Sequence, residues 1–149
     1  MVTIHPFKAL RPAAEFARQV ASRPYDVLNS KEAKTEAEGN SAAGFRLGQV
    51  LGFGQGGVSV DLGQARAHYR RAARAGHLDA MDFYARALYA GRGGKRDRAA
   101  AVEWWGRAAG KRHAPSIANL AWTRCSSRDA ELRDPVAGTR LVTDALQHV

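Results

Sequence analysis

The sequence has almost no cysteine and no long hydrophobic run. Cys125 is the only cysteine among 149 residues, so the chain can form neither an internal disulfide nor a metal cluster held by several thiolates. Nowhere do about eighteen uncharged apolar residues follow one another, and the first residues lack the apolar core of a signal peptide. We therefore expect a protein without membrane insertion, with the cytoplasm as its default location.

Acidic residues are few compared with basic ones. The chain holds 23 Lys and Arg side chains against 14 Asp and Glu, which gives a net charge of +9 at pH 7. Residues 1–42 are close to neutral, so almost all of the excess lies in residues 43–149. Such an excess makes an acidic partner possible, whether nucleic acid, acidic protein or anionic membrane. Any electrostatic function belongs to residues 43–149.

What the sequence does contain is an internal repeat. The stretch VDLGQARAHYRRAARAGHLDA begins at Val60, and the similar stretch RDRAAAVEWWGRAAGKRHAPS begins at Arg96, 36 positions later. A constant period near 36 residues is typical of stacked helical units. One such unit cannot bury its apolar faces, whereas several stacked units can, so the pattern predicts a solenoid.

Each unit is expected to contain two antiparallel helices, A and B, joined by a glycine-rich turn. Leu47, Val50 and Leu51 have the spacing of one apolar helix face. Asp61 and Asp97 stand where they can cap the N-terminus of a B helix. The predicted A helices cover residues 43–53, 80–90 and a segment from 116, the B helices cover 62–75, 98–109 and 135–149, and the units are 43–79, 80–115 and 116–149.

The ends of the B helices differ between the units. Gly76 is expected to close the first B helix in the left-handed conformation that glycine adopts readily. Arg112 stands at the equivalent position of the second unit, so the pattern predicts that Gly110 takes this role instead. In the third unit Leu141 and Val142 replace the aromatic pair of the second, which is typical of a terminal unit.

The repeat resembles Sel1-like repeats, which are relatives of the tetratricopeptide repeat. The first unit supplies the family's pattern with Ala43, Leu47-Gly48, Leu51, Gly54, Gly56, Asp61, Ala65, His68-Tyr69, Ala72-Ala73, Gly76 and Ala80. The second unit supplies it again with Tyr84-Ala85, Leu88, Gly91, Gly93, Asp97, Ala101, Trp104-Trp105 and Ala108-Ala109. The resemblance implies an all-α, right-handed solenoid over residues 43–149, with the A helices on its concave surface.

Residues 1–42 do not follow the repeat. The segments IHPFKALRP and PYDV, followed by an EA-rich stretch and Gly39-Asn40, resemble the start of a bacterial family of unknown function, and the resemblance implies a relationship to ParB-like domains. The residues predict a short strand at 2–4 and helices at 13–22 and 31–38, the second ending at Gly39-Asn40. We interpret the segment as a truncated or fused leader that packs loosely or pairs with another chain, and we assign it no catalytic residue.

The A helices carry a candidate surface for a protein or peptide partner. Gln49, Arg86 and Trp122 occupy the same repeat position, so an extended peptide could run across all three units. A column of aromatic and Arg side chains has the composition of a protein interface. The A-helix positions predicted to be free of packing are Arg46, Gln49, Phe53, Asp82, Phe83, Arg86, Asn119 and Trp122. They favour a scaffold or adaptor function, with the identity of the partner and the oligomeric state left open.

The alternative function is nucleic-acid binding by the first B helix. Arg66, Arg70, Arg71 and Arg74 could form a basic face that grips phosphates, although such a face is also an ordinary solvated surface. Binding of single strands needs aromatic side chains between the basic ones, and the aromatic residues of the B helices are already assigned to packing. The sequence therefore favours a protein partner over nucleic acid.

No group of residues predicts catalysis, a metal or a cofactor. The glycines from Gly52 to Gly57 match a dinucleotide-binding pattern, but a helix precedes them and the pattern recurs at Gly91, so we interpret them as turn residues. His77 and His113 share a loop position and are interpreted as solvated loop residues rather than zinc ligands. Cys125 has no histidine beside it in the sequence. We therefore expect a protein that is not an enzyme.

Overall fold

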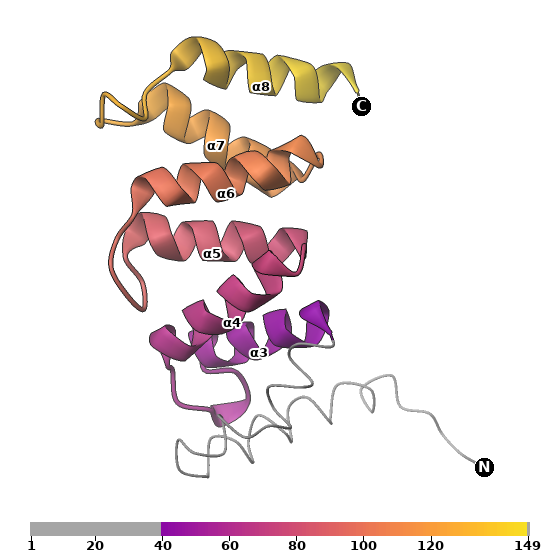
Figure 1. Cartoon of the computed structure of the whole chain (residues 1–149), viewed down its shortest axis with the longest axis vertical. Coiled ribbons are helices and arrows are strands. Elements are labelled where there is room, and N and C mark those ends of the chain that lie inside the picture. Colours follow the sequence, from indigo (N-terminus) through magenta and orange to yellow (C-terminus); the bar gives the residue numbers. More distant parts are fainter. Residues whose placement is uncertain (1–39, 149) are drawn as a thin grey trace, which may run out of the picture.

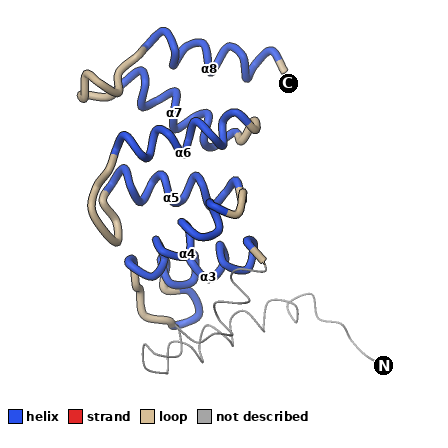
Figure 2. Tube along the Cα trace, viewed as in Figure 1, coloured by secondary structure: helices blue, strands red, loops and turns tan. Residues whose placement is uncertain are grey.

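The computed structural model describes residues 40–148, and this part of the chain is all-helical. Every α-helix in it is 13 residues long, and no strand occurs between residues 40 and 148 (Figure 2). The elements are α3 (Ser41–Phe53), the 3-10 helix η1 (Gln55–Gly57), α4 (Leu62–Arg74), α5 (Leu78–Ala90), α6 (Arg98–Gly110), α7 (Ala114–Ser126) and α8 (Pro135–Gln147). None of these helices is long and apolar enough to cross a membrane.

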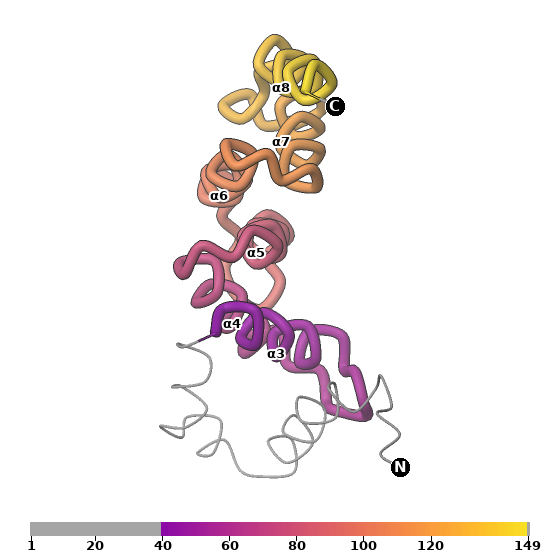
Figure 3. The backbone as a smooth tube through the Cα atoms, turned by 90° about the vertical axis from the view of Figure 1, so that its right-hand side faces the viewer, coloured from indigo at the N-terminus to yellow at the C-terminus, as the bar shows by residue number. Residues whose placement is uncertain are grey.

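The helices are stacked in chain order from α3 at one end to α8 at the other (Figure 1). Within the units α3 packs on α4, α5 on α6 and α7 on α8, while α4 packs on α5 and α6 on α7 between units. Seen from the side, the helices step along one axis rather than gathering around a common centre (Figure 3). The predicted all-α solenoid of helix pairs is therefore confirmed.

An aspartate starts each of the three B helices. The side chains of Asp61, Asp97 and Asp134 each accept a hydrogen bond, at 3.0 Å, from the backbone N–H three residues further on. The backbone N–H of each aspartate also donates to a carbonyl oxygen near the end of the preceding A helix, at 2.9, 2.9 and 2.8 Å. Each aspartate thus caps one helix and fixes the end of its partner, and the predicted caps Asp61 and Asp97 are confirmed.

Glycines shape the turns after the A helices. Gly54 and Gly91 end α3 and α5 in the left-handed conformation, with φ of 65° and 72°. Gly56, Gly57 and Gly93 also have positive φ. These angles suit glycine, because a side chain would strain them. The glycine pattern therefore builds the turn between the helices of a unit, as predicted.

The core combines small residues at helix contacts with large aromatic rings. Ala101 and Ala108 of α6 are fully buried, and Tyr69 and Trp105 lie in the same core. A Cβ atom on Gly48 of α3 would come within 2.6 Å of Cε1 of the Tyr69 ring. The ring of Tyr69 therefore occupies the space that the missing side chain leaves, and α3 can approach α4 closely.

The A helices begin earlier than predicted. They start at Ser41, Leu78 and Ala114 instead of at residues 43, 80 and 116. Asn40, which was interpreted as the end of a preceding helix, caps α3 by accepting hydrogen bonds from Ala42 and Ala43. Nδ1 of His77 accepts a hydrogen bond from Ala80 at 3.1 Å and caps α5. These caps lie outside the apolar pattern, which is why periodicity alone places the helix starts too late.

Arg112, and not Gly110, takes the left-handed position after α6, so this prediction was wrong. Arg112 has φ of 61°, while Gly110 lies inside the helix. The backbone N–H of Arg112 donates to Ala109 and that of His113 donates to Ala108, which repeats the pattern at Gly76. The connection between units thus fixes this backbone conformation, whatever side chain the sequence supplies.

The predicted strand at residues 2–4 and the helices predicted at 13–22 and 31–38 lie outside the described residues.

Replacing Arg112 with glycine should stabilise the protein. The left-handed conformation costs a residue with a side chain about 1–2 kcal/mol, and part of this gain is offset by the greater entropy of glycine in the unfolded chain. We expect the free energy of unfolding of Arg112→Gly to rise by about 0.5–1 kcal/mol in urea titrations. Gly76→Ala is the matched control, because Gly76 has φ of 93° with no other atom near its Cβ position, and it should lose a similar amount. Changes of the same sign in the two variants would contradict this account.

Candidate functional site: a groove lined by aromatic and arginine side chains

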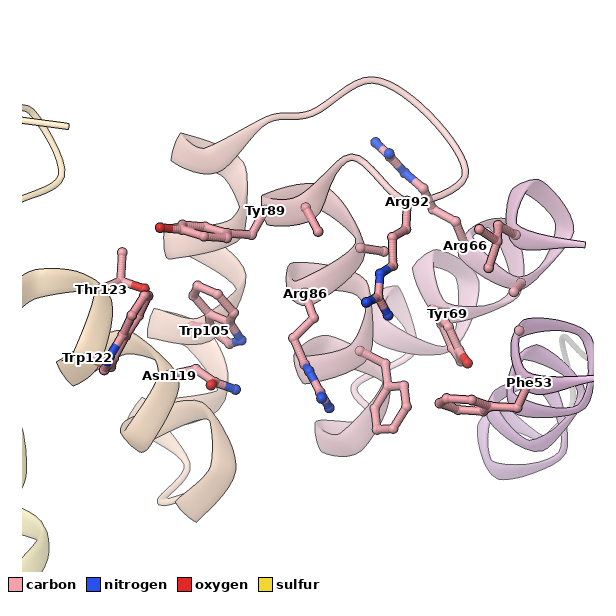
Figure 4. A pocket seen from close by; sticks show the side chains of 16 residues that line it. Phe53, Arg66, Tyr69, Arg86, Tyr89, Arg92, Trp105, Asn119, Trp122 and Thr123 are labelled. Atoms are coloured by element: carbon pink, nitrogen blue, oxygen red, sulfur yellow. The ribbon is translucent and has the colours of Figure 1, made fainter. Parts of the chain in front are cut away.

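A groove with a volume of about 310 Å³ runs across the described units. Its walls come from α3 and α4 on one side and from α6 and α7 on the other, with α5 between them (Figure 4). This volume lies at the lower end of the range of roughly 300–1,000 Å³ found for ligand pockets. The groove can therefore hold a few side chains of a partner, but not a folded domain.

Two large aromatic side chains lie exposed at the edges of the groove. Phe53 of α3 is 59% exposed and Trp122 of α7 is 62% exposed. Phe83 of α5 packs edge-on against Phe53, with ring centroids 6.3 Å apart, and lies 5.3 Å from the ring of Tyr69. The α3 side of the groove is therefore an aromatic wall, and Trp122 stands on the opposite side.

A buried carboxylate joins three helices beneath the groove. Asp82 of α5 is only 3% exposed. Its Oδ1 accepts hydrogen bonds from Nε1 of Trp105 on α6 at 2.9 Å and from Nδ2 of Asn119 on α7 at 2.8 Å. Its Oδ2 lies 3.6 Å from Nη1 of Arg86. The prediction that Asp82 is free of packing was wrong, because a carboxylate with three partners belongs to the structure rather than to the exposed surface.

Arginine side chains supply the charge of the groove. Arg86 lies with its guanidinium carbon 5.1 Å from the centre of the Phe83 ring, a cation–π contact. Arg92 enters from the turn after α5, between Arg86 and Tyr69, and Arg66 reaches the same turn from α4 (Figure 4). Neither Asp nor Glu is among the residues that line the groove. The groove is therefore both aromatic and positively charged.

Tyr69 remains a neutral phenol in this environment. Burial raises the pKa of Tyr69 to about 12, and the positive charge of Arg86 opposes that rise. A Cβ atom on Gly52 would lie 3.1 Å from the Tyr69 hydroxyl oxygen, so the hydroxyl sits beside the end of α3. Tyr69 thus contributes a hydrogen-bonding group to the groove without a negative charge.

The groove brings together most, but not all, of the residues predicted to bind a partner. Phe53, Phe83, Arg86, Asn119 and Trp122 line it. The remaining predicted residues, Arg46, Gln49 and Asp82, are not among its lining residues. Of the column predicted through Gln49, Arg86 and Trp122, only Arg86 and Trp122 therefore line the groove.

Tyr89 and Arg92 are among the groove residues that sequence reasoning missed. Tyr89 lies near the end of α5, where Arg98 stacks on its ring at 4.9 Å, and Arg92 lies in the following turn. The only signal for Arg92 was a large charged residue between two turn glycines, Gly91 and Gly93. A turn is an ordinary place for an exposed arginine, so that signal is weak.

The structure separates the four arginines predicted as a basic face on α4. Arg66 is half-buried, lines the groove and packs against Gly94. Arg70, Arg71 and Arg74 are exposed and are not among the groove residues. The predicted face therefore consists of three exposed side chains, and the fourth belongs to the groove.

The interpretation of His77 and His113 as solvated loop residues was wrong. His77 caps α5, and its ring stacks on Phe45 with centroids 4.8 Å apart. His113 precedes α7 and links two units, with Nδ1 at 2.8 Å from Oγ of Ser116 and Nε2 at 2.8 Å from Oδ1 of Asp79. At the start of α5 a histidine nitrogen thus replaces the usual Asp or Ser cap, which a search for common capping residues does not reveal. At the start of α7 the His113 ring contacts side chains and makes no cap bond to the backbone.

The Ser116, His113 and Asp79 chain has the residue types of a nucleophilic triad, but Ser116 is 0% exposed. A serine without access to solvent cannot attack a substrate. The hydrogen-bonded chain therefore has a structural role, which is to join α5 to α7.

Two other kinds of site that could carry chemistry are a metal centre and a reactive cysteine. Between residues 40 and 148 no group of three His, Cys, Asp or Glu side chains could hold a metal ion. Cys125 is an exposed residue whose Sγ lies against the Gly138 backbone of α8.

His68 of α4 is the buried histidine that titrates abnormally. Burial, together with the smaller effect of the positive charge of Arg71, lowers its pKa from 6.5 to about 4. Its Nδ1 has no hydrogen-bond partner within the described part of the chain. Protonation would place an unpaired charge in the core, so the imidazole is neutral at physiological pH.

Comparison with known proteins identifies the family. The model of a family described as "Protein of unknown function (DUF1015)" matches residues 4–99, which is more than half of the chain. The chain belongs to this family. The match continues through α3, α4 and α5, well beyond the first forty residues in which the sequence pattern indicated the resemblance. No curated protein sequence matches the DUF1015 chain.

A solved structure shows the same fold. The crystal structure of a Sel1 repeat protein from Oxalobacter formigenes superposes with a TM-score of 0.63 at 20% sequence identity. The match covers 92% of the DUF1015 chain and 54% of the other, so the chain spans about half the length of that protein. The Sel1-like fold expected from the repeat is thus confirmed for this member of the DUF1015 family.

Removing the Asp82 carboxylate should destabilise the solenoid. Asp82→Ala leaves the buried donors of Trp105 and Asn119 without their acceptor, and we expect a loss of about 2–4 kcal/mol in the free energy of unfolding. The matched control is Asp144→Ala, which removes an exposed carboxylate of α8 and should cost no more than about 0.5 kcal/mol. Guanidinium titrations at pH 7 measure both, and equal losses would contradict the role given to Asp82.

The protein should lose stability in mild acid because of His68. Its folded pKa of about 4 lies below the unfolded value of 6.5, so the unfolded chain binds the proton first and stability falls as the pH drops from about 6.5 to 4. The shift corresponds to a loss of up to about 3 kcal/mol. In His68→Phe the free energy of unfolding should depend less on pH in this range. The control His148→Gln changes an exposed histidine and should leave that dependence as in the wild type. Equal acid sensitivity of His68→Phe and the wild type would refute the assignment.

Proposed function

We propose that this DUF1015 protein is a non-catalytic scaffold or adaptor that binds a protein or peptide in the groove. The observation that supports this most directly is the pair of exposed aromatic side chains, Phe53 and Trp122, on opposite sides of a preformed groove. Exposed aromatic residues next to arginine are the usual high-affinity contacts of protein interfaces. The partner contributes an extended segment, because the groove accepts only a few side chains.

The hydrogen bonds beneath the groove support the same function. Trp105 and Asn119 both donate to Asp82, so the α5, α6 and α7 parts of the groove are held in one arrangement. A preformed site spends little free energy on ordering itself when a partner binds. Repeated helix pairs are a common way to build extended binding surfaces. Location in the cytoplasm and a relationship to ParB-like domains stay predictions from the sequence, and neither assigns a residue to this function.

Selection from a random peptide library tests the proposed function. The wild-type protein should enrich a set of related peptides, and Phe53→Ala combined with Trp122→Ala should weaken their binding at least tenfold, since each buried aromatic contact is worth about 1–2 kcal/mol or more. Arg70→Ala with Arg74→Ala is the control, because it changes exposed side chains outside the groove and should bind like the wild type.

Two results would overturn the proposed function. One is the absence of any enriched peptide, and the other is undiminished binding by the Phe53 and Trp122 variant. A separate measurement tests the binding of mixed-sequence RNA and DNA at low and moderate salt, because phosphate contacts weaken steeply as salt rises. Tight nucleic-acid binding that survives moderate salt and requires Arg70, Arg71 and Arg74 would favour the alternative function instead.

A further inference from the structure

We infer that the groove selects a peptide segment with an acidic side chain flanked by apolar residues. The carboxylate binds Arg86 and Arg92, and the apolar neighbours pack on the aromatic walls at either side. This inference rests on the proposed function and adds the chemistry of the partner to it.

The first argument is the charge of the groove. Three of its lining residues, Arg66, Arg86 and Arg92, are basic and none is acidic. The carboxylate that faces Arg86, that of Asp82, is buried and already accepts hydrogen bonds from Trp105 and Asn119. The guanidinium groups are therefore only partly balanced from within the protein, and a negatively charged partner complements them.

Four other acidic residues of the repeats have structural roles. Asp61, Asp97 and Asp134 cap the B helices, and Asp79 contacts His113. None of these carboxylates lines the groove. Because caps and inter-unit contacts hold them elsewhere, the positive charge of the groove remains available to an external ligand.

Arg86 is positioned to receive a carboxylate. Its Nη1 faces Oδ2 of Asp82 at 3.6 Å, while its guanidinium lies on the ring of Phe83 at 5.1 Å. These two contacts restrict the side chain and leave other N–H groups free toward the groove, where Arg92 approaches from the opposite side (Figure 4). Planar guanidinium groups match carboxylates in geometry and can bind them through two parallel hydrogen bonds.

The surroundings of the two arginines require apolar neighbours in the ligand. Phe53 and Tyr69 lie on one side of Arg86 and Arg92, and Trp122 lies on the other (Figure 4). The ring of Phe83 packs against Phe53 and Tyr69 and lies under the Arg86 guanidinium. Polar neighbours would lose water at the rings of Phe53 and Phe83 without gaining hydrogen bonds. Nδ2 of Asn119 is used by Asp82, which leaves its Oδ1 to accept a backbone N–H from the segment. The groove thus offers one charged contact between two apolar ones.

The arrangement favours an acidic peptide over nucleic acid. A phosphate backbone carries regularly spaced charges and is best followed by a track of basic residues. The exposed arginines that could extend such a track, Arg70, Arg71 and Arg74, are not among the groove residues. The basic residues of the groove therefore form a short cluster between aromatic walls, which suits one or two carboxylates.

The experiment uses the peptides enriched by the wild-type protein in the library selection. Sequencing should show Asp or Glu at one position with apolar residues around it. Binding of the best peptide and of its Asp→Asn or Glu→Gln version is then measured by the intrinsic fluorescence of the protein or by calorimetry. We expect the amide version to bind the wild type at least tenfold more weakly.

Protein variants connect this preference to the two arginines. Arg86→Gln with Arg92→Gln should bind the acidic and amide peptides equally, and Arg70→Gln with Arg74→Gln, which removes the same charge outside the groove, should retain the tenfold preference. Circular dichroism checks that each variant is folded. If the double variant is unstable, Arg92→Gln alone, which changes a side chain in an exposed turn, is used to compare binding of the acidic and amide peptides. Partial loss of the preference in that single variant would support the inference.

The possible failures can be told apart. Enriched peptides without an acidic preference, or a preference that persists in Arg86→Gln with Arg92→Gln, would overturn this inference and leave the peptide-binding function intact. The absence of enriched peptides would overturn both. Displacement of the acidic peptide by a mixed-sequence RNA of higher affinity at moderate salt would also overturn both.

Discussion

The hydrogen bonds to Asp82 are the interaction on which the central part of the structure depends. A carboxylate at 3% exposure is costly unless it is well paired, and here three helices supply its partners. Trp105 comes from α6 and Asn119 from α7, so the contact fixes the position of both helices relative to α5. The same carboxylate restrains Arg86 at the surface. Stability of the fold and orientation of the groove are therefore coupled through one buried residue.

Much of the fold follows from local rules that are visible in the sequence. The aspartate caps and the turn glycines recur at the repeat period, and small alanines recur at the same helix contacts, so periodicity predicts the helix pairs and their stacking. Two local features escape these rules. His77 caps a helix with a ring nitrogen, and Arg112 adopts a conformation that normally favours glycine. In both cases the tertiary connection between units determines the backbone, and the residue present adapts to it.

The groove was less predictable than the fold. A helix pattern shows which side chains share a face, but not whether a polar residue on that face finds a buried partner. Asp82 could be recognised as structural only once Trp105 and Asn119 were placed beside it. Arg92 belongs to a turn, whose path toward α4 depends on the packing of Gly93 and Gly94 against that helix. Contacts between elements far apart in the sequence thus decide the composition of the site.

The departures from the repeat, rather than the repeat itself, create the distinctive chemistry of this protein. Position by position, Phe45 and Tyr69 of the first unit correspond to Asp82 and Trp105 of the second. In the first unit the two rings pack on each other with centroids 5.8 Å apart, and in the second the carboxylate accepts the indole N–H at 2.9 Å. The equivalent A-helix position of the third unit is Ala118, which carries no polar group. The same helix pair is therefore held by apolar contact in one unit and by a buried hydrogen bond in the next. Only the second unit, with its buried hydrogen bond, provides a carboxylate that restrains an arginine at the groove. The charged centre of the site therefore lies at the second unit.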